Sequence, residues 1–453
     1  MKRRRVSVAA ILVVVISTLA TSAEAKPANP LMKFKGDAFN AVATSGSKVV
    51  AAGAAQTCRW SQGDCGYYFA PRAPLVARYT QSGKLDKSFN GKGFRLLDHE
   101  AAYNAIIGVV VRPDRSLLIA YRTASSIKLI SLTRSGKLDR GFGESGGTEF
   151  PLTLFNPASR GLVALDDGRT VIPGQSSSGE FGTLVIDANG EVDTGFGDGG
   201  VATVGPPVGP LEGYTSAVAV QRGRGILALG DTIPHPGAHA MTAARFKFDG
   251  SLDPTFGTDG ITRFDLLSSA QIGLSARGIV PFGEEGIAAA CDVYGVHALD
   301  PDGSYPGSLF ENSPDQSLQV PCIGLADAVR VSDGLVAAGT IYDDNYKDGW
   351  PHPWVRQFDR TESAKLGPAE PRRTLPGGYR GFNSAVAAYG EGFVVAGSLL
   401  SDRCQPPWRP GGTRCQAATL TRLTEDGRDT SFGRDGIATL RKGVVCRGQG
   451  RCQ

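Results

Sequence analysis

The sequence predicts an all-β protein: a seven-bladed β-propeller of four-stranded antiparallel blades that follows an N-terminal signal peptide. Glycine (60) and proline (27) make up 87 of the 453 residues, a density that would interrupt long helices. Two sequence patterns, a glycine-rich motif and an apolar hairpin, each occur seven times at a mean spacing of about 58 residues. Short strands separated by turn residues at a fixed period are typical of stacked β-sheets.

The glycine-rich motif, called the repeat motif below, reads SGKLDKSFNGKG in its first copy at residues 82–93. Other clear copies begin at Ser135, Asn189, Asp249 and, in a shorter form, Asp426. Their phenylalanines are Phe89, Phe142, Phe196, Phe256 and Phe432. Eroded copies begin at Asp300 and between Trp354 and Glu370, which completes seven units.

The residue types of the repeat motif predict structural roles. Its first glycine supplies the positive φ of a tight turn, its aspartate accepts backbone N–H groups, and its phenylalanine anchors the turn on the core. A metal-binding or catalytic role is the less favoured alternative, because a reactive site rarely needs to be copied around a ring. The aspartates concerned are Asp86, Asp139, Asp193 and Asp253.

The apolar hairpin precedes each repeat motif and supplies two of the four strands of a unit. The seven hairpins begin at Asn40, Asn104, Gly161, Ser216, Ala276, Asp327 and Ser384. One further strand precedes the motif and one follows it. A closed ring is favoured over an open β-solenoid, because no distinct capping unit is present. We expect segments 32–35 and 436–440 to complete one shared blade and close the ring.

The repeat motif, together with its V-V-A-A-G hairpin, resembles the delta-60 repeat of exported bacterial proteins. The resemblance covers nearly the whole chain after the signal peptide; it is strong in units one to four, partial in unit seven, and weak in units five and six. It implies β-propeller blades and an extracytoplasmic setting. It supplies no catalytic residues.

The N-terminus has the pattern of a signal peptide, and we expect a secreted or extracytoplasmic protein. Lys2 to Arg5 form a basic region, Val6 to Ala20 an apolar core, and Ala23-Glu24-Ala25 a cleavage site. The apolar core of about 15 residues is shorter than the ~20 residues of a membrane span. Cleavage would leave 44 basic and 43 acidic residues, a formal charge of +1, which gives no reason to expect nucleic acid as a partner.

The predicted organisation is therefore a signal peptide (residues 1–25), a propeller (26–442) and a C-terminal tail (443–453) with a small disulfide loop. An oxidising compartment favours disulfides over metal binding, and no C-x-x-C pair is present. Proximity suggests four local pairs, although eight cysteines allow 105 pairings. These pairs are Cys58/Cys65, Cys291/Cys322, Cys404/Cys415 and Cys446/Cys452.

Two motifs of catalysis are absent from the sequence: it contains no H-E-x-x-H and no P-loop. His235 and His239 flank Pro236 in an expected loop, where surface histidines are favoured over a metal site. The segment 343–349 resembles a calcium loop only faintly, because Lys347 takes the fifth position. No catalytic residue, metal or cofactor is predicted, and an enzyme is the less favoured class.

All four tryptophans fall in the expected loops between the second and third strands of units one, six and seven. They are Trp60, Trp350, Trp354 and Trp408. Ring closure would bring these units together, and exposed aromatic clusters mark binding sites. The sequence thus favours a monomeric binding or scaffold module for an unknown protein or cell-wall glycan. In the alternatives, the rings fill small cores of their own loops, or the protein is a hydrolase or lactonase with a site in the central channel.

The signal pattern predicts cleavage after Ala25, because small residues occupy both recognised positions of the A-x-A site. Mass spectrometry of the exported protein should find Lys26 at the N-terminus. An exported chain that still begins with Met1 would contradict the prediction.

Overall fold

A computed structural model describes the protein from residue 38 onward, with gaps. The described ranges are 38–56, 72–97, 105–158, 161–204, 211–235, 238–264, 276–281, 287–291, 295–304, 325–331, 334–341, 352–360, 366–367, 380–400, 416–424, 427–434, 436–440, 446–447 and 451–452. The expected signal peptide lies outside them. Within the described ranges, no helix has the length and apolar character needed to span a bilayer.

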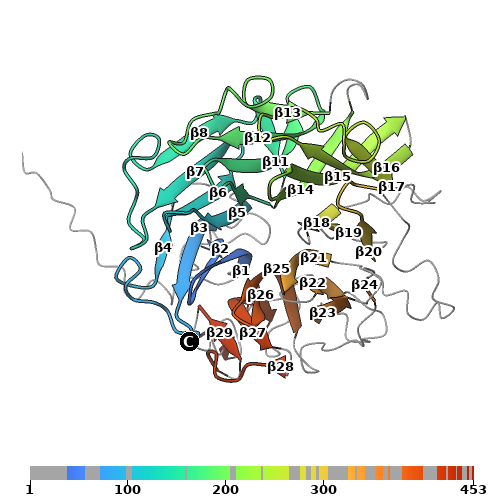
Figure 1. The fold of residues 1–453 in the computed structure, drawn as a ribbon. Coiled ribbons are helices and arrows are strands. Elements are labelled where there is room, and N and C mark those ends of the chain that lie inside the picture. The colour runs from blue at the N-terminus through green and yellow to red at the C-terminus, as the bar shows by residue number, and fades with distance from the viewer. Residues whose placement is uncertain are drawn as a thin grey trace, which may run out of the picture.

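The chain folds as an all-β propeller whose blades are antiparallel sheets (Figure 1). Blade one contains β1 (Ala38–Ser45), β2 (Lys48–Gln56), β3 (Arg72–Tyr79) and β4 (Phe94–Leu96). Blade two contains β5 (Ala105–Val111), β6 (Leu117–Arg122), β7 (Ser126–Leu132) and β8 (Gly147–Pro151). Blade three contains β9 (Phe155–Pro157), β10 (Val163–Ala164), β11 (Thr170–Ser176), β12 (Phe181–Ile186) and β13 (Val201–Thr203). Blade four contains β14 (Gly213–Gln221), β15 (Gly225–His235), β16 (Ala238–Phe246) and β17 (Ile261–Phe264).

The second half of the chain continues the same plan. A three-stranded sheet contains β18 (Ala276–Pro281), β19 (Ile287–Cys291) and β20 (Gly295–Leu299). Blade six contains β21 (Leu325–Val331), β22 (Gly334–Ile341), β23 (His352–Arg360) and β24 (Leu366–Gly367). Blade seven contains β25 (Arg380–Tyr389), β26 (Gly392–Leu400), β27 (Gln416–Thr424), β28 (Gly427–Arg428) and β29 (Ile437–Thr439). A two-stranded sheet of β30 (Cys446–Arg447) and β31 (Arg451–Cys452) follows.

The prediction of a propeller with four-stranded antiparallel blades is confirmed, but the count of seven such blades is wrong. The described residues form six blades of four or more strands, and the three-stranded sheet occupies the remaining position between blades four and six. The physical reason lies in unit five, whose eroded motif keeps the turn at Asp300 and Gly303 but lacks the Leu-Asp pair and the glycine that follows phenylalanine. The segment after Ser304, where a fourth strand would arise, is outside the described residues.

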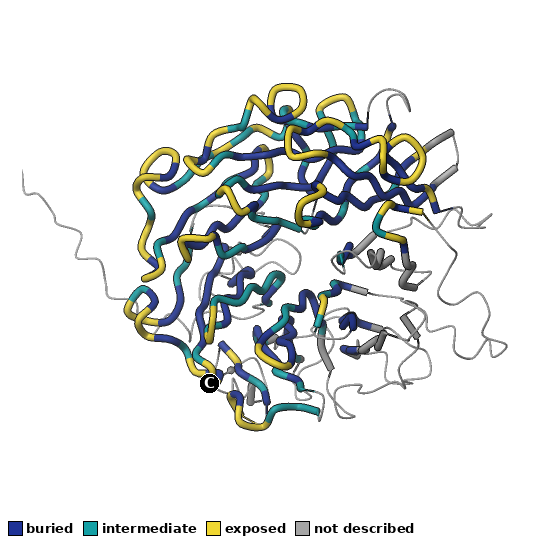
Figure 2. Tube along the Cα trace, viewed as in Figure 1, coloured by how far each residue is buried: buried dark blue, intermediate teal, exposed yellow. Residues whose placement is uncertain are grey.

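The ring closes because the first blade packs on the last. β1 contacts β25 and β26, and a shared apolar core joins Phe39 and Val49 of blade one to Val394 and Leu420 of blade seven. Of the two segments expected to complete a shared closing blade, 436–440 supplies β29, which pairs with β27 of blade seven. Segment 32–35 lies outside the described residues, so the shared blade stays a prediction. Figure 2 shows buried strands throughout the blades and exposed turns between them.

A β-bulge in the first strand explains the glycine of the apolar hairpin. The pairing of the first and second strands shifts by one residue in six of the seven sheets. Gly53, Gly230 and Gly397 lie opposite this shift. A Cβ on Gly230 would lie 2.0 Å from the Tyr214 carbonyl oxygen, so the close approach of two backbones requires glycine here.

Each repeat motif packs against the motif of the next unit. The first glycine of one motif lies over the phenylalanine of the preceding one: a Cβ on Gly136 (φ +78°) would meet the Phe89 ring at 2.7 Å, and a Cβ on Gly190 would meet Phe142 at 2.9 Å. The backbone N–H that follows the phenylalanine then donates to the carbonyl that precedes this glycine, at 2.6–2.9 Å. These bonds run from Asn90 to Ser135, Gly143 to Asn189, Gly197 to Asp249, Gly257 to Asp302 and Gly433 to Ser82.

The contact between Gly136 and Phe89 predicts a loss of stability that exceeds the cost of backbone strain. Gly136→Val should lower the free energy of unfolding by roughly 2–5 kcal/mol, because valine strains a positive φ and also collides with the fully buried Phe89 ring. Gly223→Val is the matched control, since Gly223 has φ +70° with no atom within 4 Å of an added Cβ. It should cost only roughly 1–2 kcal/mol. If urea denaturation gave both variants the same loss of unfolding free energy, the close contact with the Phe89 ring would not contribute to stability.

Candidate functional site

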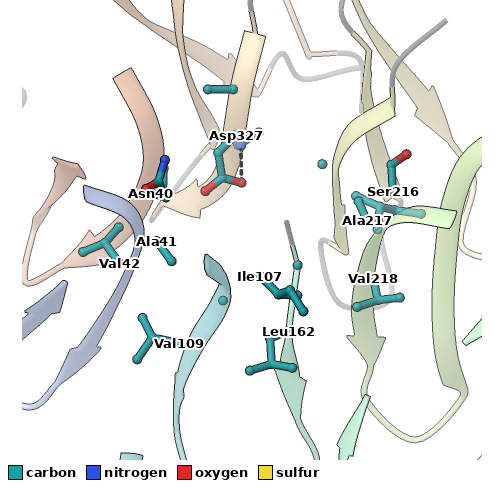
Figure 3. A pocket seen from close by; sticks show the side chains of 17 residues that line it. Asn40, Ala41, Val42, Ile107, Val109, Leu162, Ser216, Ala217, Val218 and Asp327 are labelled. Carbon is teal, nitrogen blue, oxygen red and sulfur yellow. Dashed lines mark hydrogen bonds between the residues drawn. The ribbon is translucent and has the colours of Figure 1, made fainter. Parts of the chain in front are cut away.

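A cavity of about 180 Å³ lies where the first strands of the sheets meet (Figure 3). All seven sheets of the ring contribute to it, with lining residues at positions 40–42, 107–109, 161–162, 216–218, 278–279, 326–328 and 385. Most lining side chains are small and apolar, such as Ala41, Val109 and Ala217. Asn40, Ser216 and Asp327 supply the polar side chains. The side chains at this centre of the ring are therefore mainly small and apolar.

Asp327 is the titratable side chain among the described residues that line this cavity. Its Oδ1 accepts a hydrogen bond from the N–H of Ala328 at 2.9 Å, and its Oδ2 accepts one from the N–H of Val386 at 2.9 Å. Val386 lies in β25, so the carboxylate joins blade six to blade seven. Both oxygens thus hold backbone amides, which gives Asp327 a structural role at the blade junction.

Metal-binding geometry is not found in the part of the chain that the structure describes: no three His, Cys, Asp or Glu side chains gather there. His235 ends β15 and His239 lies in β16, and these two strands pair with each other; Pro236 lies outside the described residues. The faint calcium-like segment at 343–349 lies outside the described residues.

The aspartates of the repeat motif have a partner that sequence reasoning missed: an arginine. The five described pairs are Arg78–Asp86, Arg112–Asp139, Arg169–Asp193, Arg245–Asp253 and Arg422–Asp429. In blade four, Arg245 Nε donates to Asp253 Oδ2 at 2.6 Å, and the two side chains are 3% and 10% exposed. Asp253 Oδ1 also accepts the N–H and the hydroxyl of Thr255. The expected acceptor role of the aspartate is seen, now with a buried ion pair added to it.

The guanidinium also joins neighbouring units. It donates to a backbone carbonyl of the next repeat motif, in the pairs Arg78 to Arg134, Arg112 to Ala188, Arg169 to Phe248 and Arg245 to Pro301. It lies over the motif phenylalanine as well, with the Arg245 carbon Cζ 5.0 Å from the centre of the Phe256 ring. These four arginines thereby bind their own motif and the motif of the next unit.

The arginine reaches the same position from two places in the chain. In blades one, four and seven it comes from the third strand, as Arg78, Arg245 and Arg422. In blades two and three the corresponding third-strand residues are Ser131 and Val185, whose backbones bond the motif in the same way. There the guanidinium comes from the first hairpin, as Arg112 and Arg169. A spacing of eight residues between Arg78 and Asp86, repeated by Arg245 and Asp253, was the available sequence signal.

Of the four tryptophans in the predicted aromatic cluster, the structure describes only Trp354. This residue lies inside β23, opposite Gly339, and it is 8% exposed. Its carbonyl oxygen accepts a hydrogen bond from Asn383 Nδ2 at 2.8 Å. The expectation that all four tryptophans lie in loops is therefore wrong for Trp354, because the third strand of unit six begins at His352. Trp60, Trp350 and Trp408 lie outside the described residues.

The four disulfides remain predictions. Cys291 ends β19 and Cys446 lies opposite Cys452 between β30 and β31. Cys58, Cys65, Cys322, Cys404 and Cys415 lie outside the described residues.

Comparison with known proteins gives structural matches only. No family model matches the sequence, and no curated protein matches it. A solved structure of inactive virginiamycin B lyase from Staphylococcus aureus is 10% identical, with a TM-score of 0.42 over 80% of this chain and 92% of that one. The β-propeller domain of the Trilobed protease from Pyrococcus furiosus is 9% identical, with a TM-score of 0.42 over 90% and 97%.

An acylaminoacyl peptidase from Pyrococcus horikoshii is 10% identical, with a TM-score of 0.44 over 90% of this chain and 52% of that one. At this level of similarity the matches assign no activity to the chain. The fold assignment rests on the sheets described above.

The ion pair of Asp253 predicts a loss of stability in acid. Burial raises the pKa of this carboxyl, but the hydrogen bonds from Thr255 and the charge of Arg245 lower it more, and the pKa lies below its ordinary value of 3.8. Such a group stabilises the fold above its unfolded pKa, and this stabilisation is lost as the pH falls through the folded pKa. The free energy of unfolding, from urea titrations, should therefore fall below about pH 5.

Asp253→Asn tests the assignment. At neutral pH it should cost roughly 3–5 kcal/mol, because it leaves the buried Arg245 without its counter-charge, and it should flatten the fall in acid. Glu391→Gln, at an exposed turn between β25 and β26, is the control and should follow the wild-type profile. A steep acid dependence that survives in Asp253→Asn would assign it to other carboxyls.

Proposed function

We propose that this chain is an exported β-propeller that acts as a binding or scaffold module for a protein or glycan partner. The observation that carries the proposal is the centre of the ring. Its described lining is mainly small and apolar, and its carboxylate, Asp327, already holds the amides of Ala328 and Val386. A rigid ring of this kind suits the display of loops better than acid–base chemistry at its axis.

The order of the blades supports a binding face formed by units one, six and seven. β25 contacts both β1 and β21, so these three units are consecutive in the ring. Their second strands end at Gln56, Ile341 and Leu400. Because corresponding strands of a propeller end on the same face, the segments that follow start side by side. Those segments carry Trp60, Trp350 and Trp408, which we propose as the contact residues.

The enzymatic alternative, a hydrolase or lactonase with its site in the central channel, needs several polar side chains that converge there. Asp327, Asn40 and Ser216 are the polar side chains of the described lining. Asp327 accepts two amide hydrogen bonds that join blades six and seven, and no second titratable side chain is present in the described lining to share acid–base chemistry with it. The binding function therefore accounts for more of the geometry.

The proposal also includes three features that the sequence alone predicts. These are export through the N-terminal signal, membership of the delta-60 repeat proteins, and four local disulfides.

The proposed binding face predicts that one triple variant loses binding and another does not. Changing Trp60, Trp350 and Trp408 to alanine should remove ~2 kcal/mol or more of binding if one of them is a hot spot. Trp354 stays unchanged, because it is buried in β23 and its removal would test folding instead. A glycan array and a pull-down of exported proteins, with wild type and variant side by side, provide the measurement.

The control is the double variant Leu138→Ala and Phe248→Ala, which removes exposed apolar side chains from other units. It should bind as the wild type does, and circular dichroism should show equal folding for all three proteins. If the tryptophan variant bound every partner as tightly as the control, the aromatic face would not be the binding site.

A further inference from the structure

One hairpin turn of the ring departs from a rule that seven others obey. Eight described turns share a pattern in which residue i donates to the carbonyl of i+4 and residue i+3 donates to the carbonyl of i. Residue i+3 has a positive φ in all of them, as expected for a type I turn with a G1 bulge. It is glycine in seven turns: Gly83, Gly136, Gly168, Gly179, Gly190, Gly250 and Gly303. In the eighth turn it is Arg115, with φ +65°.

An arginine at this position is unfavourable for the fold. A side chain other than glycine, asparagine or aspartate is uncommon at positive φ, and glycine would satisfy the turn without strain. Backbone strain of this kind is found at functional sites, where the side chain has a use that the fold does not require. The structure shows where Arg115 lies: it lines a cavity.

This cavity, of about 270 Å³, lies between the turns of blades one and two. Its charged lining residues are Lys48, Arg78, Arg115, Arg134 and Asp86, four basic residues around a single acid. The formal charge of the lining is therefore +3. Arg115 and Arg134 are exposed, and within the described residues neither side chain has an ion-pair partner.

Asp86 offsets one of these four positive charges, and it does so next to Lys48 and Arg78. Its Oδ1 accepts the N–H and the hydroxyl of Ser88, while its Oδ2 accepts Arg78 Nε at 3.0 Å and lies 3.3 Å from Lys48 Nζ. Arg78 also donates to Ser88 and to the Arg134 carbonyl. Among the described lining residues, no second acid is present to pair with Arg115 and Arg134.

The junction between blades two and three does not carry this excess. At the position of Arg134, directly before the turn residue that accepts the inter-unit bond, units three, four and five have Ala188, Phe248 and Pro301. At the position of Arg115, unit three has Gly168. The arginine of that junction, Arg169, is paired with two acids, Asp167 and Asp193. Because all junctions share one architecture, the fold itself does not call for the extra arginines between blades one and two.

We propose that the cavity between blades one and two binds a phosphate group. Guanidinium and ammonium groups carried on separate turns around one cavity match an oxyanion that accepts hydrogen bonds at several oxygens. The positive charge is gathered in a single cavity and forms no stripe along the surface, so it fits one phosphate group better than a nucleic-acid backbone. The site lies at the turns between first and second strands, on the face opposite the proposed aromatic contacts, and does not depend on them.

Isothermal titration calorimetry with sodium phosphate, at constant ionic strength in chloride, tests the proposal on the full exported chain. Wild type should show saturable binding, and Arg115→Gly should weaken it roughly ten-fold or more through the loss of a charged donor. Because glycine is the residue of the seven matching turns, this variant should keep or raise the thermal midpoint. Arg134→Ala, which copies unit three, should also weaken binding.

The matched control is Arg224→Ala, which removes one exposed arginine from the corresponding turn of blade four and should leave phosphate affinity unchanged. A parallel titration with glycerol phosphate separates the two sources of the ligand: equal affinity indicates a phosphate ester carried by a larger partner, and binding of inorganic phosphate alone indicates the free ion. Absence of saturable phosphate binding, or equal losses in Arg115→Gly and Arg224→Ala, would overturn the proposal.

Discussion

The contact between consecutive repeat motifs is the interaction on which the ring depends. A phenylalanine of one unit packs against a glycine of the next, and a backbone hydrogen bond joins the two turns. An arginine donates hydrogen bonds to both repeat motifs. Burial of Phe142 or Phe256 alone would stabilise a single turn. Because the same ring also receives the neighbouring unit, its burial fixes the angle between blades, and the position of every strand end follows from it.

The sequence predicted the parts of this junction that lie within one motif and missed those that arrive from elsewhere. Gly136 and Phe142 were predicted because a tight turn and a buried anchor leave local patterns. The arginine was not, since Arg245 comes from a third strand and Arg169 from a first hairpin, and only the folded sheet shows that they fill one position. The glycine of the apolar hairpin was noticed but unexplained; Gly230 is needed because a bulge brings the backbone of Tyr214 against it.

The candidate sites also differ in how far the sequence predicted them. Trp354 looked like part of an aromatic loop, yet β23 begins two residues earlier and buries its side chain, because a short apolar run does not show where a loop ends. The basic cavity gave no motif at all. Lys48, Arg78, Arg115 and Arg134 are spread over 87 positions of the sequence, and comparison of equivalent turns within one chain makes Arg115 conspicuous.

The bond from Gly433 to Ser82 has a consequence for how the chain could be cut and rejoined. It is the same turn-to-turn bond that links units one and two or three and four, so in the described residues the junction of the first and last units is built like those joints. A closed ring can be opened at any joint of this kind. A circular permutant whose chain starts at another unit should therefore fold into the same propeller, with its two termini at a different junction between units.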